Sequence, residues 1–344
     1  MGQRVIARVV QVAPGRFAPG HLGELTQQVP FEMVDAVLAQ TRAVQSRVRV
    51  LPARVVVYLV LAGCLFAELG YRQVWHRLVA GLDGLACPSA AALTQAWRRL
   101  GAAPLRALFD LLRGPAAVPG GAAGVRWRGL LVCAIDGTFS SRFGGVPVRV
   151  SEAEITIATT AGRATGAYRL ATFLLDHRAY PETDLIRLYH QRWEIETACL
   201  ELKSTILGGR VLRARTPAGV DQEVYALLVT YQILRTAMAD ATSTQPGTGP
   251  DRASFALALH AARDQVIQAA GIIAGTTIDL AGNIGRLVLA GLLPSRRLRA
   301  SARTVKRAIS KYNARGPGID RRTYKATLTI SILTQAALTT SAGP

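Results

Sequence analysis

Four side chains between residues 189 and 203 have the types and the spacing expected for chemistry on an anionic substrate. They are a tyrosine, an arginine, a carboxylate and a lysine: Tyr189, Arg192, Glu196 and Lys203. On an ideal α-helix with about 100° per residue, all four fall within an arc of about 60° and extend over about 21 Å. The arc borders an apolar stripe, which would hold the carboxylate firmly beside its basic neighbours. The plainer alternative is a solvated pair between Arg192 and Glu196, worth roughly a few tenths of a kcal/mol.

The spacing Tyr-x2-Arg-x3-Glu-x6-Lys resembles the signature of a large family of bacterial insertion-sequence transposases. These are DDE enzymes with an RNase H-like catalytic core. Two further stretches are similar to the family: AIDGT around Asp136, and LRARTPAGVDQEVYALL after the motif. The resemblance covers most of residues 30–240. It implies that Asp136 is the first catalytic aspartate, at the end of a core strand, and that Glu196 is the catalytic glutamate.

The resemblance also implies a role for each motif residue. Asp136 and Glu196 would ligate one or two Mg²⁺ ions, or Mn²⁺, that activate water or a 3′-hydroxyl for attack on a phosphodiester. Arg192 and Lys203 would contact phosphates, so the expected partner is double-stranded DNA with the terminal inverted repeats of a transposon. Tyr189 would stack on or hydrogen-bond to the displaced strand. A homodimer in a synaptic complex is compatible with these roles.

The composition favours a polyanionic partner. The chain has 344 residues, with 41 Lys and Arg against 22 Asp and Glu, and a formal net charge of +19. Such a charge attracts nucleic acid or an acidic membrane surface. Four scattered cysteines without a C-x-x-C pair, and no secretory segment near Met1, favour a cytoplasmic, nucleoid-associated protein. The longest apolar run, residues 55–67, is too short to cross a bilayer and predicts a buried helix.

The periodicity of the apolar residues predicts a mixed α+β fold in five consecutive parts. They are an irregular arm, a helical N-terminal domain that binds DNA, a linker rich in Gly and Pro, a truncated RNase H-like core, and a helical region with a basic tail. Their expected boundaries are 1–30, 31–114, 115–128, 129–240 and 241–344. Helices are thus expected first, then strands, then helices again.

Two basic segments predict contacts with DNA. Ser89 as an N-cap and a break at Gly101 predict two short helices around a turn. With Arg98 and Arg99 projecting, they are compatible with a helix-turn-helix reader of DNA, and an ordinary helical hairpin is the alternative. Residues 296–325 hold eleven Lys and Arg and predict either a basic helix or a disordered tail. Either form would bind nucleic acid without sequence preference.

The chain departs from the family pattern at one essential point. A DDE site needs a second aspartate on another core strand, and none occurs in a matching context between Asp136 and Glu196. Only 59 residues lie between these two positions, whereas average element lengths require about 75–80. We therefore interpret the chain as a transposase that has lost a central segment, and we expect impaired strand cleavage. Asp176, after the apolar stretch ATFLL, is the expected substitute ligand if cleavage survives.

Two other functions are compatible with the sequence. A non-catalytic remnant would bind transposon ends, or inhibit a full-length transposase, without metal-dependent nicking. A basic structural protein unrelated to transposition would show no preference for inverted repeats. The sequence contains no Walker A motif and no G-x-S-x-G motif, so ATP-driven and serine-hydrolase functions have no support.

Overall fold

The computed structural model describes most of the chain and divides it into two compact units. The described residues are 10–11, 22–45, 51–80, 86–114, 126–128, 130–131, 149–190, 194–269, 277–278, 282–294, 299–301 and 322–333. The first unit combines Met1–Cys133 with Thr197–Pro294, and the second combines Ala134–Glu196 with Ser295–Pro344. Each unit is discontinuous in sequence, whereas the sequence predicted domains made of consecutive residues.

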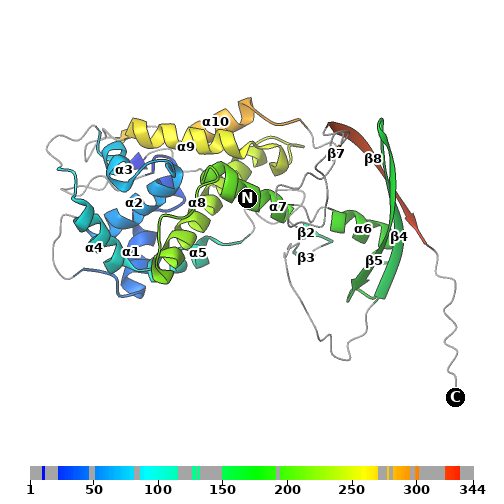
Figure 1. Cartoon of the computed structure of the whole chain (residues 1–344), viewed down its shortest axis with the longest axis horizontal. Coiled ribbons are helices and arrows are strands. Elements are labelled where there is room, and N and C mark those ends of the chain that lie inside the picture. The colour runs from blue at the N-terminus through cyan, green and yellow to red at the C-terminus, as the bar shows by residue number, and fades with distance from the viewer. Residues whose placement is uncertain are drawn as a thin grey trace, which may run out of the picture. The chain divides into compact units, whose positions relative to one another are not determined.

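The first unit is a helical bundle around α8 (Pro217–Ser243), a helix of 27 residues. The helices that precede α8 are α1 (Phe31–Gln40), α2 (Ala53–Leu65), α3 (Tyr71–Leu78), α4 (Ala90–Leu100) and α5 (Ala103–Leu112). The helices that follow are α9 (Phe255–Ala269) and α10 (Asn283–Ala290). Helix α8 packs against α2, α5, α9 and α10 (Figure 1). Short 3-10 turns lie at Leu25–Gln27 and Pro250–Arg252. Two pairs of two-residue strands complete the described part of the unit. Strand β1 (Val10–Gln11) pairs with β6 (Thr277–Ile278), and β2 (Arg126–Trp127) pairs with β3 (Leu130–Leu131).

The apolar run predicted to be a buried helix is α2, and the prediction is confirmed. Every residue of this helix except Arg54 is buried, and Arg54 forms an ion pair with Asp35 of α1. The hydroxyl group of Tyr58 donates a hydrogen bond of 2.6 Å to the carbonyl oxygen of Val29. Burial raises the pKa of the Cys64 thiol to about 12. In the part of the chain that the structure describes, no helix is long and apolar enough to cross a bilayer.

Part of the segment expected to be an irregular arm belongs to the helical core. Leu22 and Leu25 are fully buried. The carboxylate of Glu24 accepts hydrogen bonds of 3.0 Å from the backbone N–H groups of Gly282 and Ile284, at the N-terminus of α10. A carboxylate in this position satisfies N–H groups that the helix itself leaves unpaired. Such a role leaves no periodic pattern in the sequence.

The second unit contains an antiparallel sheet of four strands in the order β5-β4-β8-β7. A two-residue turn joins β4 (Arg149–Thr159) to β5 (Gly162–Thr172). Alternate side chains of β4, such as Ala153 and Ile155, cluster with Ile186 of α6 (Glu182–His190) in a small core. Helix α6 lies beside this sheet (Figure 1). The apolar residues of EITIATT alternate with other residues, as is typical of a strand with one buried face. The mixed α+β class is confirmed.

The C-terminal region matches its prediction only in part. Helices α9 and α10 lie in its first half, as expected. Where a basic tail was expected, β7 (Arg299–Ser301) and β8 (Thr323–Ile332) join the sheet, and β8 pairs with β4. Residues 302–321, which hold much of the predicted basic segment, lie outside the described residues. The stretch TYKATLTISI alternates polar and apolar residues, as strands do, and the count of basic residues concealed that pattern.

Candidate functional site

The segment that carries the predicted motif is helical along its described length. Tyr189 lies on α6, Glu196 on α7 and Lys203 on a π-helix, and all three side chains are exposed. The bounds of the last two elements are Glu194–Leu200 and Glu201–Ile206. Residues 191–193 lie outside the described residues, and Arg192 is among them. Helix formation through this region confirms the expected local structure.

The π-helix changes the projected arrangement of the motif. Its i→i+5 pattern is seen in the hydrogen bond of 3.1 Å from the backbone N–H of Leu207 to the carbonyl oxygen of Leu202. A π-turn holds more residues than an α-turn, so each residue advances by less than about 100°. Lys203 is therefore rotated relative to the ideal helix assumed from the sequence. The arc of about 60° that an ideal α-helix predicts for the four motif residues therefore does not apply to Lys203.

Glu201 fixes the π-helix to the helical bundle. Its side chain is 13% exposed, and one oxygen lies 3.6 Å from Nη1 of Arg235. The other oxygen accepts a hydrogen bond of 2.9 Å from the hydroxyl of Tyr231. Ile206, at the end of the π-helix, is 1% exposed within the core. Sequence reasoning missed Glu201, because both of its partners lie about 30 residues away on α8.

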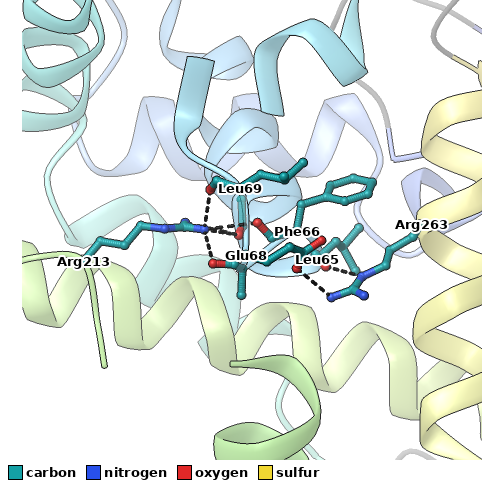
Figure 2. A network of polar contacts seen from close by, with 8 residues as sticks. Leu65, Phe66, Glu68, Leu69, Arg213 and Arg263 are labelled. Carbon is teal, nitrogen blue, oxygen red and sulfur yellow. Dashed lines mark hydrogen bonds and ion pairs between the residues drawn. The ribbon is translucent and has the colours of Figure 1, made fainter. Parts of the chain in front are cut away.

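Arg213 lies in the stretch that follows the motif and holds the connection between α2 and α3. Its Nη2 atom is 2.9–3.2 Å from four carbonyl oxygens (Figure 2), those of Gly63, Phe66, Ala67 and Leu69. The guanidinium carbon lies 4.8 Å from the centre of the Tyr71 ring. A cation is favoured at this end of α2, where the last carbonyl groups of the helix lack partners.

Two neighbouring side chains of α8 connect this helix to the segment around Arg213 and to α4. Glu223 is 5% exposed, and its two oxygens accept hydrogen bonds of 3.0 and 2.9 Å from the backbone N–H groups of Arg213 and Ala214. Gln222 donates from Nε2 to the carbonyl oxygen of Trp97 on α4, at 3.2 Å. The resemblance pointed to this stretch as a family feature, and the structure gives it a role in packing.

Arg263 of α9 holds the connection between α2 and α3 from another direction (Figure 2). Its Nε atom donates to the carbonyl oxygen of Leu65 at 2.5 Å, and its Nη2 atom lies 3.2 Å from the carboxylate of Glu68. The guanidinium carbon lies 6.0 Å from the centre of the Phe66 ring. Two arginines from distant parts of the chain therefore fix one short loop.

The predicted metal ligands differ in what the structure describes. Asp136 lies outside the described residues, so its pairing with Glu196 stays a prediction. Within the described ranges, no hydrogen bond or ion pair engages the Glu196 carboxylate, and no group of three potential metal ligands occurs. An exposed carboxylate is a hard oxygen donor of the kind that Mg²⁺ prefers. Glu196 alone therefore fits as one ligand of such an ion.

Asp176 does not end a strand, which corrects the expectation for this residue. Strand β5 ends at Thr172, and Asp176 lies in the turn that follows. Its Oδ1 atom accepts hydrogen bonds of 3.0 and 2.8 Å from the backbone N–H groups of Ala179 and Arg178, and these bonds hold the pKa of the carboxyl group below its usual range. The carboxylate organises its own turn, so the strand-end argument for a substitute ligand no longer applies.

The two short helices predicted around Gly101 are confirmed as α4 and α5. The hydroxyl of Ser89 accepts a hydrogen bond of 3.1 Å from the backbone N–H of Ala92, which is the predicted N-cap. Arg98 and Arg99 lie exposed in the last turn of α4. A cavity of about 490 Å³ lies between α2, α4 and the start of α8, and Arg98 is one of its lining residues. Contact of these helices with DNA stays a prediction.

Comparison with known proteins finds similarity to transposases. The model described as Insertion element 4 transposase N-terminal matches residues 19–110, and the model described as Transposase DDE domain matches residues 91–233. The Transposase InsG for insertion sequence element IS4, from Escherichia coli (strain K12), is 30% identical over 144 residues, which are 42% of this chain and 33% of that protein. Over residues 19–233 the chain is similar to DDE transposases of the IS4 family. No solved structure matches it.

The matched regions end inside the helical bundle. The match to the DDE domain stops at residue 233, within α8, and therefore includes Glu196, Glu201 and Arg213. Arg263 and strand β8 lie beyond both matches. The similarity to InsG spans about one third of the length of that relative.

Proposed function

We propose that this chain binds the double-stranded DNA of transposon ends and takes part in metal-dependent phosphodiester chemistry through Asp136 and Glu196. The observation that carries the proposal is the exposed carboxylate of Glu196, on a helix within the segment that matches the transposase DDE domain. Binding of this kind would place the chain at the nucleoid of the bacterial cytoplasm. A homodimer on paired ends belongs to the same proposal.

Each side chain of the motif has a role in this proposal. Glu196 and Asp136 would hold Mg²⁺ or Mn²⁺, which when bound stabilises the charge that develops on the phosphate and the leaving oxygen. Lys203, exposed on the anchored π-helix, and Arg192 would neutralise phosphates. Tyr189, with an exposed ring, would stack on a displaced base. Arg98 and Arg99 would meet the phosphates of the adjoining duplex.

We further propose that strand cleavage by this chain is impaired. The described part of the interval between Asp136 and Glu196 is largely a hairpin and a helix, with no aspartate at a strand end. On the hairpin, Glu152 forms an ion pair of 2.5 Å with Arg169. The alternative function, a non-catalytic remnant that occupies transposon ends or inhibits a full-length transposase, rests on the same missing aspartate.

A binding and nicking assay separates these functions. The substrate is a duplex carrying the inverted repeat that flanks the gene, with Mg²⁺ or Mn²⁺, and the proteins are wild type, Glu196→Gln and Glu154→Gln. Glu154 is a matched control, because it is an exposed carboxylate on the sheet. Nicking that survives in the control but not in Glu196→Gln supports catalysis, and binding without nicking supports the remnant. Equal affinity for unrelated DNA would refute both.

A further inference from the structure

We propose that Arg213 is a positioning residue that connects the π-helix carrying Lys203 to helix α4, so that Lys203 and the Arg98–Arg99 pair meet DNA as one rigid surface. The inference rests on the proposed DNA-binding function and deepens it. All of these residues belong to the first unit. A continuous series of contacts links them.

The first link runs from Lys203 to Arg213 along the backbone. Gly208 and Gly209 follow the π-helix, and both lie in the left-handed region with φ of +59° and +74°. The backbone N–H of Gly209 donates a hydrogen bond of 2.9 Å to the carbonyl oxygen of Lys203. Leu212 then packs against the hydrophobic core. Arg213 follows Lys203 by only ten positions, and the turn and the packing restrict the residues between them.

The second link is the guanidinium group of Arg213 itself. It binds the carbonyl oxygens at the end of α2 and stacks on the ring of Tyr71, at 4.8 Å. Such a site requires a planar group with several donors in fixed directions, which arginine has and lysine lacks. A Cβ atom at Gly63 would lie 2.5 Å from the Tyr71 ring. The missing side chain at Gly63 therefore allows the ring to lie where Arg213 can stack on it.

The third link runs from Tyr71 to α4. The ring centres of Tyr71 and Trp97 are 5.0 Å apart, and the Trp97 carbonyl group accepts the hydrogen bond from Gln222. Trp97 directly precedes Arg98 and Arg99 in the last turn of α4. A displacement of the Arg213 side chain would thus remove one connection between the Lys203 segment and the helix that carries the two arginines, while Glu201 would still attach the π-helix to α8.

The test uses the salt dependence of DNA binding as its readout. A lysine that contacts one phosphate contributes about 0.9 to the slope of log K against log salt concentration. We expect Lys203→Ala to lower the slope by about that amount in the wild-type background and by clearly less in an Arg213→Met background. A general loss of stability would leave the effect of Lys203→Ala the same in both backgrounds.

Arg54→Met is the matched control variant. Arg54 is also a partly buried arginine that stacks on an aromatic ring, that of Phe31, and it pairs with Asp35 away from this series of contacts. In this background Lys203→Ala should retain its full effect on the slope. Arg213→Lys should resemble Arg213→Met, because an ammonium group cannot form the same set of contacts.

Hydrogen exchange tests the connection without DNA. Arg213→Met should raise amide exchange in residues 65–71 and 201–212, and leave the hairpin at 149–172 unchanged. Exchange that rises at 65–71 alone would overturn the inference, whatever the protein binds. An equal effect of Lys203→Ala with and without Arg213, or no effect on the slope in wild type, would also overturn it. A chain that shows the exchange pattern but does not bind the repeat would instead refute the proposed function.

Discussion

The carboxyl group of Asp176 is fully exposed, yet the backbone around it controls its ionisation. Hydrogen bonds from the N–H groups of Ala179 and Arg178 lower its pKa in the folded protein. Because the folded value lies below the unfolded value of about 3.9, the contribution of this turn to stability is present above that pH and is lost as pH falls through the folded value. We expect the Asp176 carboxyl carbon to titrate with a midpoint below about 3.9 in an NMR experiment. A titration midpoint of Asp176 at or above about 3.9 would contradict the hydrogen bonds that the turn provides.

Single residues also show where sequence reasoning succeeds and where it fails. Ser89 was predictable, because its capping partner lies three residues away and the side chain type is diagnostic. Arg213 was not, because its side chain bonds to a loop that lies about 150 residues earlier in the chain. The role of Glu223 was not predicted either, because its carboxylate bonds to backbone N–H groups of an irregular segment. The sequence around a charged residue does not reveal how deeply its side chain is buried or which group it will bind. Asp136 and Arg192, which lie outside the described residues, stay predictions.

Helices α4 and α8 illustrate the same contrast between local and distant determinants. Both begin at a capping hydroxyl, Ser89 and Thr216, that accepts a hydrogen bond from an N–H group in the first turn. A local signal of this kind, at Ser89, together with the break at Gly101, predicted the two helices around Gly101. The π-helix at Glu201–Ile206 depends instead on contacts with α8. No local pattern in the sequence distinguishes it from a regular α-helix.

The anchor of the π-helix can be tested by truncating Glu201. Glu201→Ala would leave the Tyr231 hydroxyl and the Arg235 guanidinium without their carboxylate partner in a poorly solvated site. We expect the free energy of unfolding to fall by about 1–3 kcal/mol, measured by urea denaturation. The matched change Glu152→Ala removes an exposed ion pair with Arg169 and should cost less than about 1 kcal/mol. Equal losses for the two variants would contradict the anchoring role.

The molecule as a whole buries one large core from three separated stretches of sequence. A single cluster of buried side chains extends from Leu22, through α2 and α5, to Ile233 of α8 and Val288 of α10. The linker-like composition near residue 115 indicated a boundary, but it gave no sign that α8 and α9 pack against the helices before it. Sequence composition indicates where linkers lie, whereas tertiary packing determines which helices share one core.

The N-terminal helices should therefore depend on the later helices for a stable fold. We expect a fragment of residues 19–114 to be helical but without cooperative thermal unfolding, since removing α8 exposes its apolar surface to water. Adding a fragment of residues 197–294 should restore a cooperative transition, measured by near-ultraviolet circular dichroism. A sharp transition for the first fragment alone would show that it is an independent domain.

The position of β8 has a consequence for how the protein is made. Strand β8 pairs with β4, yet it is translated about 150 residues after the β4–β5 hairpin is complete. At ribosomal rates of about 5–20 residues per second, the nascent hairpin waits roughly 8–30 s for this neighbour. During that interval the backbone amide and carbonyl groups along one edge of β4 are unpaired and can bind a strand of another chain. Chaperones that bind nascent chains would find their target there, between the synthesis of Thr172 and that of Thr323.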